Sequence, residues 1–295
     1  MSALEEMDDL FLLEDVSEKT AFLQDGDVER WARNLNFFGS FCRFGENKQV
    51  PQRKIQTCKV ALLGLGGLGS HLLFDLAALG CKDIRAVEFD NVEMSNLNRQ
   101  ILYTPSDIGR RKADVAGKRI LDFSPDLRFE VYNRKIENTE DVAIALRGRD
   151  VAICVADRPK MEILHWVNEA CVKARIPLLT GGLDTQVCRY YCTLPGEGCL
   201  ECWLSHVRDT QPGAHEILEE RRRTQLRGDN AAFVAFVALL SGLMIAEFTK
   251  IVTGIGGKPD AQNKTREIDF SKMTIETGET WSKNPSCSCC STGRP

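Results

Sequence analysis

The 295-residue chain has no uninterrupted apolar stretch long enough to cross a membrane. Its longest apolar stretch, residues 231–246, is broken by Ser241 and Gly242 and predicts a buried helix instead. Basic residues are not in excess: the formal net charge is −4, which gives no electrostatic reason to expect a nucleic-acid partner. The amino-terminal residues are acidic and lack the basic segment of a secretory signal. We therefore expect a cytoplasmic protein that binds neither membranes nor nucleic acids.

The sequence contains twelve cysteines, but none occurs between Cys202 and Cys287. Thiols in a reducing compartment stay mostly free, so their spacing points to metal binding before disulfides. Two C-x-x-C pairs, Cys199 with Cys202 and Cys287 with Cys290, supply the four thiolates of a closed tetrahedral zinc site. Cys289 is an alternative fourth ligand, and the fold must bring the two distant pairs together.

Residues 59–90 contain the clearest motif of the chain. An apolar strand is predicted over 59–63, a helix over 68–79 and a second strand over 84–89. The turn between the first strand and the helix fits the nucleotide fingerprint G-x-G-x-x-G, in which glycines permit a tight turn and close approach to phosphate. The turn holds Gly64, Gly66, Gly67 and Gly69. Asp90 follows at the distance typical of an acid that binds ribose.

Strands and helices alternate over residues 59–179, which predicts a doubly wound, mostly parallel α/β sheet of the Rossmann-like class, with helices on both faces. The remaining elements of this part are helices over 109–123, 139–146 and 160–174 and strands over 127–132, 151–155 and 176–179. Gly181-Gly182 is then expected to turn the chain, and residues 185–193 alternate as in an antiparallel strand. Residues 205–228 are polar and predict a mobile loop or an exposed helix, before a buried helix over 229–253.

Polar residues follow the ends of the predicted strands. Amide, guanidinium and ammonium groups come after Asp90, at Asn96, Arg99, Gln100 and Lys112. Such cations can neutralise a triphosphate and the charge that develops on it during reaction. Asp157 follows the apolar strand 151–155 and supplies an oxygen ligand of the kind Mg²⁺ prefers. The alternative is a helix cap, since Pro159 is suited to a first helical position.

These motifs together carry a family resemblance. The sequence GLGGLGS, followed by FDNVEMSNLNRQ and GRRKA, resembles the ThiF/MoeB/HesA family of adenylating enzymes, related to the catalytic domain of ubiquitin-activating enzymes. The resemblance covers about residues 29–254 and the C-terminal cysteines. It implies a ThiF-like adenylation domain over 29–295, with a zinc element formed by 199–202 and 287–290, after an acidic arm over 1–28. It also implies ATP, Mg²⁺ and Zn²⁺ as cofactors and a homodimeric assembly.

The resemblance also implies roles for single residues. Asp90 would bind the ribose, Asp157 would hold magnesium, and the phosphates would be surrounded by Asn96, Arg99, Gln100 and Lys112. The sequence RWARN is similar to the family's R-Y-x-R-Q, so Arg33 would reach the γ-phosphate of the partner subunit. The family places its structural zinc on two cysteine pairs like those here. Asn34 and Glu88 depart from the usual glutamine and aspartate.

The implied reaction is adenylation of a C-terminal carboxylate with release of pyrophosphate. Some relatives carry a nucleophilic cysteine just after the first C-x-x-C pair, whereas this chain has none between Cys202 and Cys287. Cys188 and Cys192 lie upstream on a predicted strand, where a structural role is expected. We therefore expect the chemistry to stop at the adenylate or to pass it directly to a nitrogen, sulfur or water nucleophile.

Several substrates stay open at this point. The candidate carboxylates are those of a ubiquitin-like sulfur-carrier protein, of a ribosomally made precursor peptide, and of a small molecule or RNA as in the dehydratase branch. A non-catalytic scaffold that binds nucleotide or a leader peptide is the alternative of a different class. A dinucleotide oxidoreductase is a weaker rival because it has no use for the sequence SNLNRQ.

Overall fold

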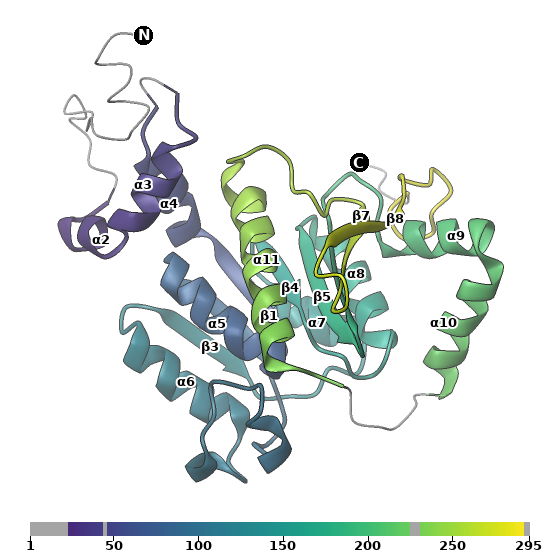
Figure 1. Cartoon of the computed structure of the whole chain (residues 1–295), viewed down its shortest axis with the longest axis horizontal. Coiled ribbons are helices and arrows are strands. Elements are labelled where there is room, and N and C mark those ends of the chain that lie inside the picture. Colours follow the sequence, from purple (N-terminus) through teal and green to yellow (C-terminus); the bar gives the residue numbers. More distant parts are fainter. Residues whose placement is uncertain (1–22, 44–45, 225–230, 292–295) are drawn as a thin grey trace.

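The computed structural model describes residues 23–43, 46–224 and 231–291. Most of the predicted acidic arm, residues 1–22, lies outside them. The described part forms a sheet with the strand order β3-β2-β1-β4-β5-β6-β7-β8. Its helices pack in layers on the two faces of this sheet (Figure 1). The predicted α/β class is confirmed.

Five strands form the parallel part of the sheet: β1 (Lys59–Leu63), β2 (Asp83–Val87), β3 (Arg128–Tyr132), β4 (Val151–Cys154) and β5 (Leu178–Asp184). β1 pairs with β2 on one side and with β4 on the other. The chain therefore changes direction across the sheet between β1 and β4. A doubly wound sheet opens a crevice at the carboxyl ends of the strands at such a switch point.

Two apolar layers cover the faces of the sheet. One holds α5 (Gly67–Leu79), α6 (Lys112–Phe123) and the long α11 (Val234–Thr253), whose Leu240, Met244 and Phe248 are fully buried. The other holds α7 (Thr139–Leu146) and α8 (Glu162–Ala174). Among the described helices, α11 is long and apolar enough to span a membrane by length and composition. Its packing on α5 and β5 buries one side of this helix in the core.

The first three described helices, α2 (Asp25–Arg30), α3 (Ala32–Gly39) and α4 (Gln49–Thr57), lie at the C-terminal end of α5. The Trp31 indole donates to the carbonyl of Ala78, and Asn34 donates to the carbonyl of Leu79. The sequence over 45–57 reads as a polar connection, yet α4 forms there because Gln52 and Ile55 are fully buried. Gln52 also donates to the Leu79 carbonyl.

Three antiparallel strands, β6 (Val187–Thr193), β7 (Lys264–Asp269) and β8 (Ile275–Thr280), complete the sheet. The expected antiparallel strand over 185–193 is confirmed. The expected turn at Gly181-Gly182 is wrong, because β5 runs straight through both residues. A Cβ at Gly181 would lie 2.7 Å from the sulfur of Met244. This glycine therefore serves close packing of β5 against α11 rather than a turn.

The first cysteine pair lies at the start of α9 (Leu200–Thr210), with Cys199 as its cap and Cys202 in its first turn, and α10 (Pro212–Thr224) follows. Of the two expectations for residues 205–228, the exposed helix is the right one as far as the described residues extend. α9 is anchored by its buried face, which includes Leu204 and Val207. α10 packs mainly on α9 and projects away from the sheet (Figure 1).

Candidate functional site

The glycine turn between β1 and α5 lies against the end of β4. Gly64 has a φ of +99°, and a Cβ there would lie 3.0 Å from the backbone nitrogen of Ala156. A Cβ at Gly69 would lie 2.0 Å from the carbonyl oxygen of Gly64. Both positions therefore require glycine, as the fingerprint predicts. No side chain caps the start of α5, so its first N–H groups face the switch-point crevice and can bind an anion.

Glu88, the departure from the usual aspartate, lies directly behind this turn. Its carboxylate is buried and accepts a hydrogen bond from the Leu65 N–H at 2.8 Å. The second carboxylate oxygen accepts from the backbone N–H groups of Phe89 and Asp90. The longer side chain thus reaches both the glycine turn and the backbone of the predicted ribose residue.

The loop after β2 brings Asn96 and Gln100 to the same edge. Asn96 stabilises the loop itself. It ends the short helix η1 (Met94–Asn96), and its side-chain oxygen accepts from the backbone N–H of Glu93, the residue that caps this helix. Gln100 is 3% exposed, and its amide nitrogen would lie 3.8 Å from a Cβ at Gly66. The Gln100 side-chain oxygen has no hydrogen-bond partner among the described residues. It is therefore a polar atom available next to the glycine turn.

Arg99 and Lys112 provide the positive charge of this edge. The Arg99 side chain lies over Gly67, with its Cγ and Cδ 3.3 Å from where a Cβ would be. Its guanidinium donates to the carbonyl of Ser95. The Lys112 ammonium is 3.2 Å from the Asp90 carboxylate, and the Lys112 backbone N–H donates to the Asp90 carbonyl. The predicted ribose and phosphate residues are thus neighbours in space.

Asp157 and Arg33 occupy opposite ends of the domain. Asp157 is exposed and directly follows Ala156, whose backbone touches Gly64, so it lies at the edge that carries the glycine turn. Arg33 is exposed on α3, at the far end of α5. α5 has 13 residues, which makes it about 20 Å long. Arg33 is therefore not gathered with the other predicted site residues of its own chain.

The two cysteine pairs meet in one cluster, called the cysteine cluster below: Cys199, Cys202, Cys287 and Cys290. All four sulfurs lie within 4.8 Å of one another. Two of the sulfur–sulfur distances are 3.7 Å and 3.4 Å. Four sulfurs bound tetrahedrally to zinc at about 2.3 Å would be about 3.8 Å apart. The donor set and its spacing therefore fit zinc.

Neighbouring groups favour the thiolate form of Cys199, whereas burial raises the pKa of Cys202 and of Cys290. Backbone N–H groups donate to sulfur, from Asn284 to Cys202 and from Cys290 to Cys287. A hydrogen bond from the Cys289 thiol holds the pKa of Cys199 well below its usual range. Cys289 itself accepts from the Asn168 amide and lies beside the cluster, whereas Cys290 is one of the four gathered sulfurs.

The model of the ThiF family matches residues 32–289. The chain belongs to the ThiF family.

Three relatives illustrate its place within this family. The sulfur carrier protein adenylyltransferase of Thermus thermophilus is 33% identical, over 81% of this chain and 84% of that protein. The adenylyltransferase and sulfurtransferase MOCS3 of Drosophila virilis is 27% identical over 93% of this chain, but the chain spans only 56% of that protein. The crystal structure of E. coli MccB with ATP has 25% identity and a TM-score of 0.75, over 89% of this chain and 75% of that one.

Other cysteines of this ThiF-family chain are buried in the core. Cys188 and Cys192 are fully buried on β6, as expected for a structural role. Burial raises the pKa of Cys188 to about 11, so its thiol stays protonated at neutral pH. Neither residue has the properties of a nucleophile.

The loop between β2 and α6, called the edge loop below, contains two buried residues that sequence reasoning missed, Tyr103 and Asp107. Asp107 is 2% exposed and ends the short helix η2 (Pro105–Asp107), where it accepts from the backbone and hydroxyl of Thr104 and from Arg119. The sequence TPSD carries the signal for such a cap, a Thr followed by Pro and an acid three residues later. Tyr103 has no comparable local signal.

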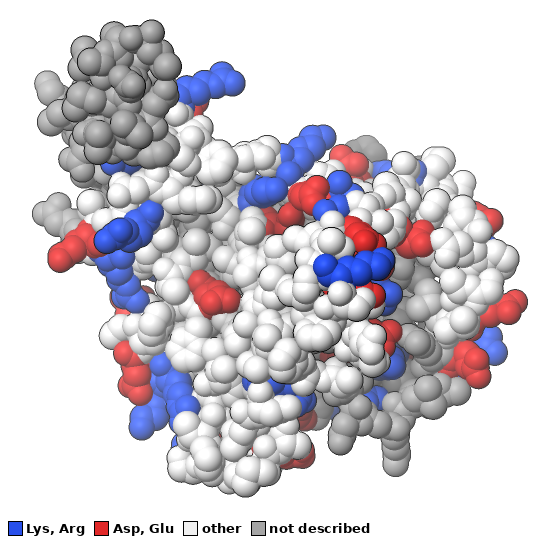
Figure 2. All heavy atoms as spheres, viewed as in Figure 1, with Lys and Arg blue, Asp and Glu red and all other residues white. Residues whose placement is uncertain are grey.

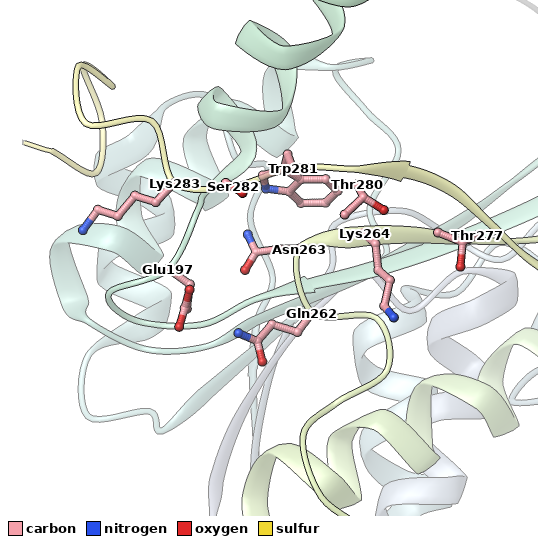
Figure 3. Close-up of a pocket in the computed structure, with 9 residues that line it drawn as sticks. All are labelled: Glu197, Gln262, Asn263, Lys264, Thr277, Thr280, Trp281, Ser282 and Lys283. Carbon is pink, nitrogen blue, oxygen red and sulfur yellow. The ribbon is translucent and has the colours of Figure 1, made fainter.

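A separate polar cavity of about 440 Å³ lies between β7, β8 and the turn before α9 (Figure 3). Figure 3 shows the Trp281 indole above Asn263, with Gln262 and Lys264 on the same wall. Trp281 packs in the apolar cluster that also contains Cys199. This cavity therefore belongs to the surroundings of the cysteine cluster and not to the edge with the glycine turn.

Proposed function

We propose that this chain is an ATP- and Mg²⁺-dependent adenylyltransferase that activates the C-terminal carboxylate of a small protein or peptide. One observation carries the proposal. The glycine turn, Asp90, Arg99 and Lys112 meet at the switch point of a doubly wound sheet. The crystal structure of E. coli MccB, whose fold is similar to that of this chain, contains ATP. The proposed adenylation domain extends over residues 29–295, and its proposed location is the cytoplasm, where thiols stay reduced.

The mechanism follows from charge. A carboxylate is ionised at neutral pH, so it needs no general base before it attacks the α-phosphorus of ATP. A P–O bond to the carboxylate forms, the bond between the α-phosphorus and the bridging oxygen breaks, and pyrophosphate leaves. Arg99 and Lys112 neutralise the charge that develops, while the glycine turn positions the phosphates. Asp157 would hold Mg²⁺, which neutralises phosphate charge when bound.

The cysteine cluster would hold a structural Zn²⁺. Three of its cysteines are buried and Cys290 is half-buried. Four cysteine ligands leave no open coordination position for chemistry. Asn168 on α8 connects the cluster to the sheet domain, since it donates to Cys289 and accepts from the backbone of Leu200. The metal would thus fasten the C-terminal residues to the rest of the domain.

The substrate class is a small protein or a peptide. A sulfur carrier protein is the substrate named for the Thermus relative, and MccB is named as a microcin C7 biosynthetic enzyme. The described chain offers no cysteine between Cys202 and Cys287 to take over the acyl group. The adenylate would therefore be released or passed directly to an external nucleophile.

ATP–pyrophosphate exchange tests this function. The full chain is incubated with ATP, Mg²⁺, labelled pyrophosphate and either a carrier protein that ends in Gly-Gly or a candidate peptide. We expect label to enter ATP only with a substrate whose C-terminal carboxylate is free, and mass spectrometry should detect its adenylate. The same substrates with an amidated C-terminus are the control. Absence of exchange with every carboxylate tested, despite ATP binding, would favour a nucleotide-binding scaffold.

The proposed assembly is a homodimer in which each subunit completes the site of its partner. Asn34, the neighbour of Arg33, lines a groove of about 400 Å³ between α5 and α11. Ala238 and Gly242 on the exposed side of α11 line the same groove. The face over α11 is mostly uncharged (Figure 2). A second copy on this face would lie next to Arg33, which is too far from the glycine turn of its own chain.

Mixing two inactive variants tests this assembly. Arg33→Ala and Arg99→Ala damage different subunits of one shared site. After unfolding and refolding of an equal mixture, half of the dimers are mixed and each contains one intact site, so about a quarter of the wild-type exchange activity should return. No recovery, with mixed dimers verified by mass spectrometry, would refute a role of Arg33 in the site of the partner subunit.

A further inference from the structure

Leu65 lies inside the glycine turn, between Gly64 and Gly66, and both polar groups of its backbone are bound by buried side chains. Its N–H donates to Glu88 Oε2 at 2.8 Å. Its carbonyl accepts from the Tyr103 hydroxyl at 2.9 Å. Glu88 is 6% and Tyr103 is 5% exposed. The turn is therefore held from inside the protein by two side chains that come from different parts of the chain.

These two hydrogen bonds orient the turn because peptide units are planar and trans. In a trans unit the carbonyl and the following N–H point in opposite directions. The Tyr103 hydroxyl holds the Leu65 carbonyl toward the interior, so the N–H of Gly66 is directed away from it. Gly66 is the glycine at which the fingerprint brings the backbone close to phosphate. Tyr103 thus acts on the direction of a phosphate-binding N–H group.

Glu88 connects this turn with the ribose side of the site. While one of its oxygens holds Leu65, the other accepts from the backbone N–H of Asp90 at 2.9 Å. The Asp90 carbonyl in turn accepts from the backbone of Lys112. One buried carboxylate therefore sets the glycine turn and Asp90 in a common frame.

Tyr103 connects the turn with the loop that carries Arg99 and Gln100. Its backbone N–H donates to the Gln100 carbonyl at 3.2 Å. Burial raises the pKa of Tyr103, and the Glu88 charge adds to this effect, so the hydroxyl stays protonated and can only donate to Leu65. Tyr103 therefore joins the loop to the turn through hydrogen bonds.

We propose that Glu88 and Tyr103 are positioning residues that fix the glycine turn for ATP. This inference rests on the proposed function and deepens it, since neither residue touches the reacting atoms. A hydrogen bond that orients the site before ATP binds affects the affinity for ATP more than the rate of the bound complex. The expected signature is a raised KM for ATP at a nearly unchanged kcat.

The test compares Tyr103→Phe and Glu88→Gln with matched controls in the full chain. Tyr132→Phe removes the hydroxyl of a half-buried tyrosine, and Glu137→Gln removes an exposed charge. We expect the KM for ATP in pyrophosphate exchange to rise about five-fold for Tyr103→Phe and at least ten-fold for Glu88→Gln. The controls should stay within two-fold of the wild type. Glu88→Asp keeps the carboxylate and should recover most of the affinity lost in Glu88→Gln.

Melting temperature and the Kd of a non-hydrolysable ATP analogue are measured on the same proteins. An unchanged KM and Kd in both variants, with a lowered melting temperature, would make Glu88 and Tyr103 structural residues only. If the wild type gives no exchange but binds the analogue, the proposed reaction fails while the positioning role is still read from Kd. A wild type that binds no nucleotide overturns both.

Discussion

The edge with the glycine turn and the cysteine cluster differ in how the chain assembles them. The edge draws its residues from one stretch, Gly64 to Lys112, with Asp157 added from the end of β4. The cysteine cluster joins pairs whose sulfurs are 88 residues apart in sequence. The edge thus depends on a local strand–turn–helix unit, whereas the cluster forms only when the whole chain has folded.

The two regions also differ in how they hold charge. At the edge, exposed or half-exposed polar groups such as Asp90, Arg99 and Asp157 face solvent and can meet a ligand. In the cluster, Cys199 and Cys202 are each 2% exposed and their sulfurs face one another. Accessible charge suits catalysis, and a closed set of buried thiolates suits a structural metal. Damage to the two regions should therefore separate activity from stability.

The largest effect is expected from the charged residues of the edge. Arg99→Ala and Asp157→Ala should each lower ATP–pyrophosphate exchange by about 10²–10³-fold, because each removes charge stabilisation from the transition state. Melting temperature should stay within about 2 °C of the wild type, since both residues lie at the surface of the site. Arg147→Ala and Asp209→Ala, at exposed positions, are the matched controls. Wild-type exchange in both edge variants would refute the assigned roles.

The cysteine cluster should show the opposite pattern. Cys202→Ser or Cys290→Ser should lose bound zinc and lower the melting temperature by at least about 5 °C, because metal binding contributes to folding. Removal of zinc by a chelator from the wild type should have the same effect. Cys289→Ser is the control and should keep one zinc per chain by metal analysis. Zinc lost from Cys289→Ser but kept by Cys290→Ser would exchange the roles of these two residues.

A smaller effect on stability is expected from Asp107, whose carboxylate holds the edge loop together and is not assigned a contact with a ligand. Burial opposes its ionised form, but hydrogen bonds from Thr104 and the charges of Arg119 and Arg110 outweigh it and lower the pKa of Asp107. A folded-state pKa below the unfolded value of about 4 stabilises the protein above that pH, and this contribution is lost as the pH falls further.

Asp107→Asn tests that dependence. The variant should melt about 3 °C lower than the wild type at pH 7, and the difference should shrink as the pH is lowered from 4 toward 3. Asp209→Asn should show no such pH dependence. A constant difference between pH 7 and pH 3 would mean that packing, and not the Asp107 charge, is what the substitution removes.

Local patterns predicted most of the parallel sheet and most residues of the edge. The apolar strands and the glycine turn were found because their periodicity and glycine spacing are local properties of the chain. The predicted turn at Gly181-Gly182 failed because both residues lie within β5, where Gly181 permits close packing against Met244 on α11. The helix α4 was missed because its burial comes from the end of α5 and not from its own polar sequence.

The sequence by itself determined the fold class, the family and the identity of the charged groups, since each of these is written in short, contiguous patterns. Only the tertiary structure decided that Glu88 and Tyr103 hold Leu65 from within, that Cys290 rather than Cys289 joins the gathered sulfurs, and that Arg33 lies one helix length from its own glycine turn. The physical reason is common to all three. A hydrogen bond, a ligand set or a reach of about 20 Å depends on distances in space between residues that are far apart in the chain.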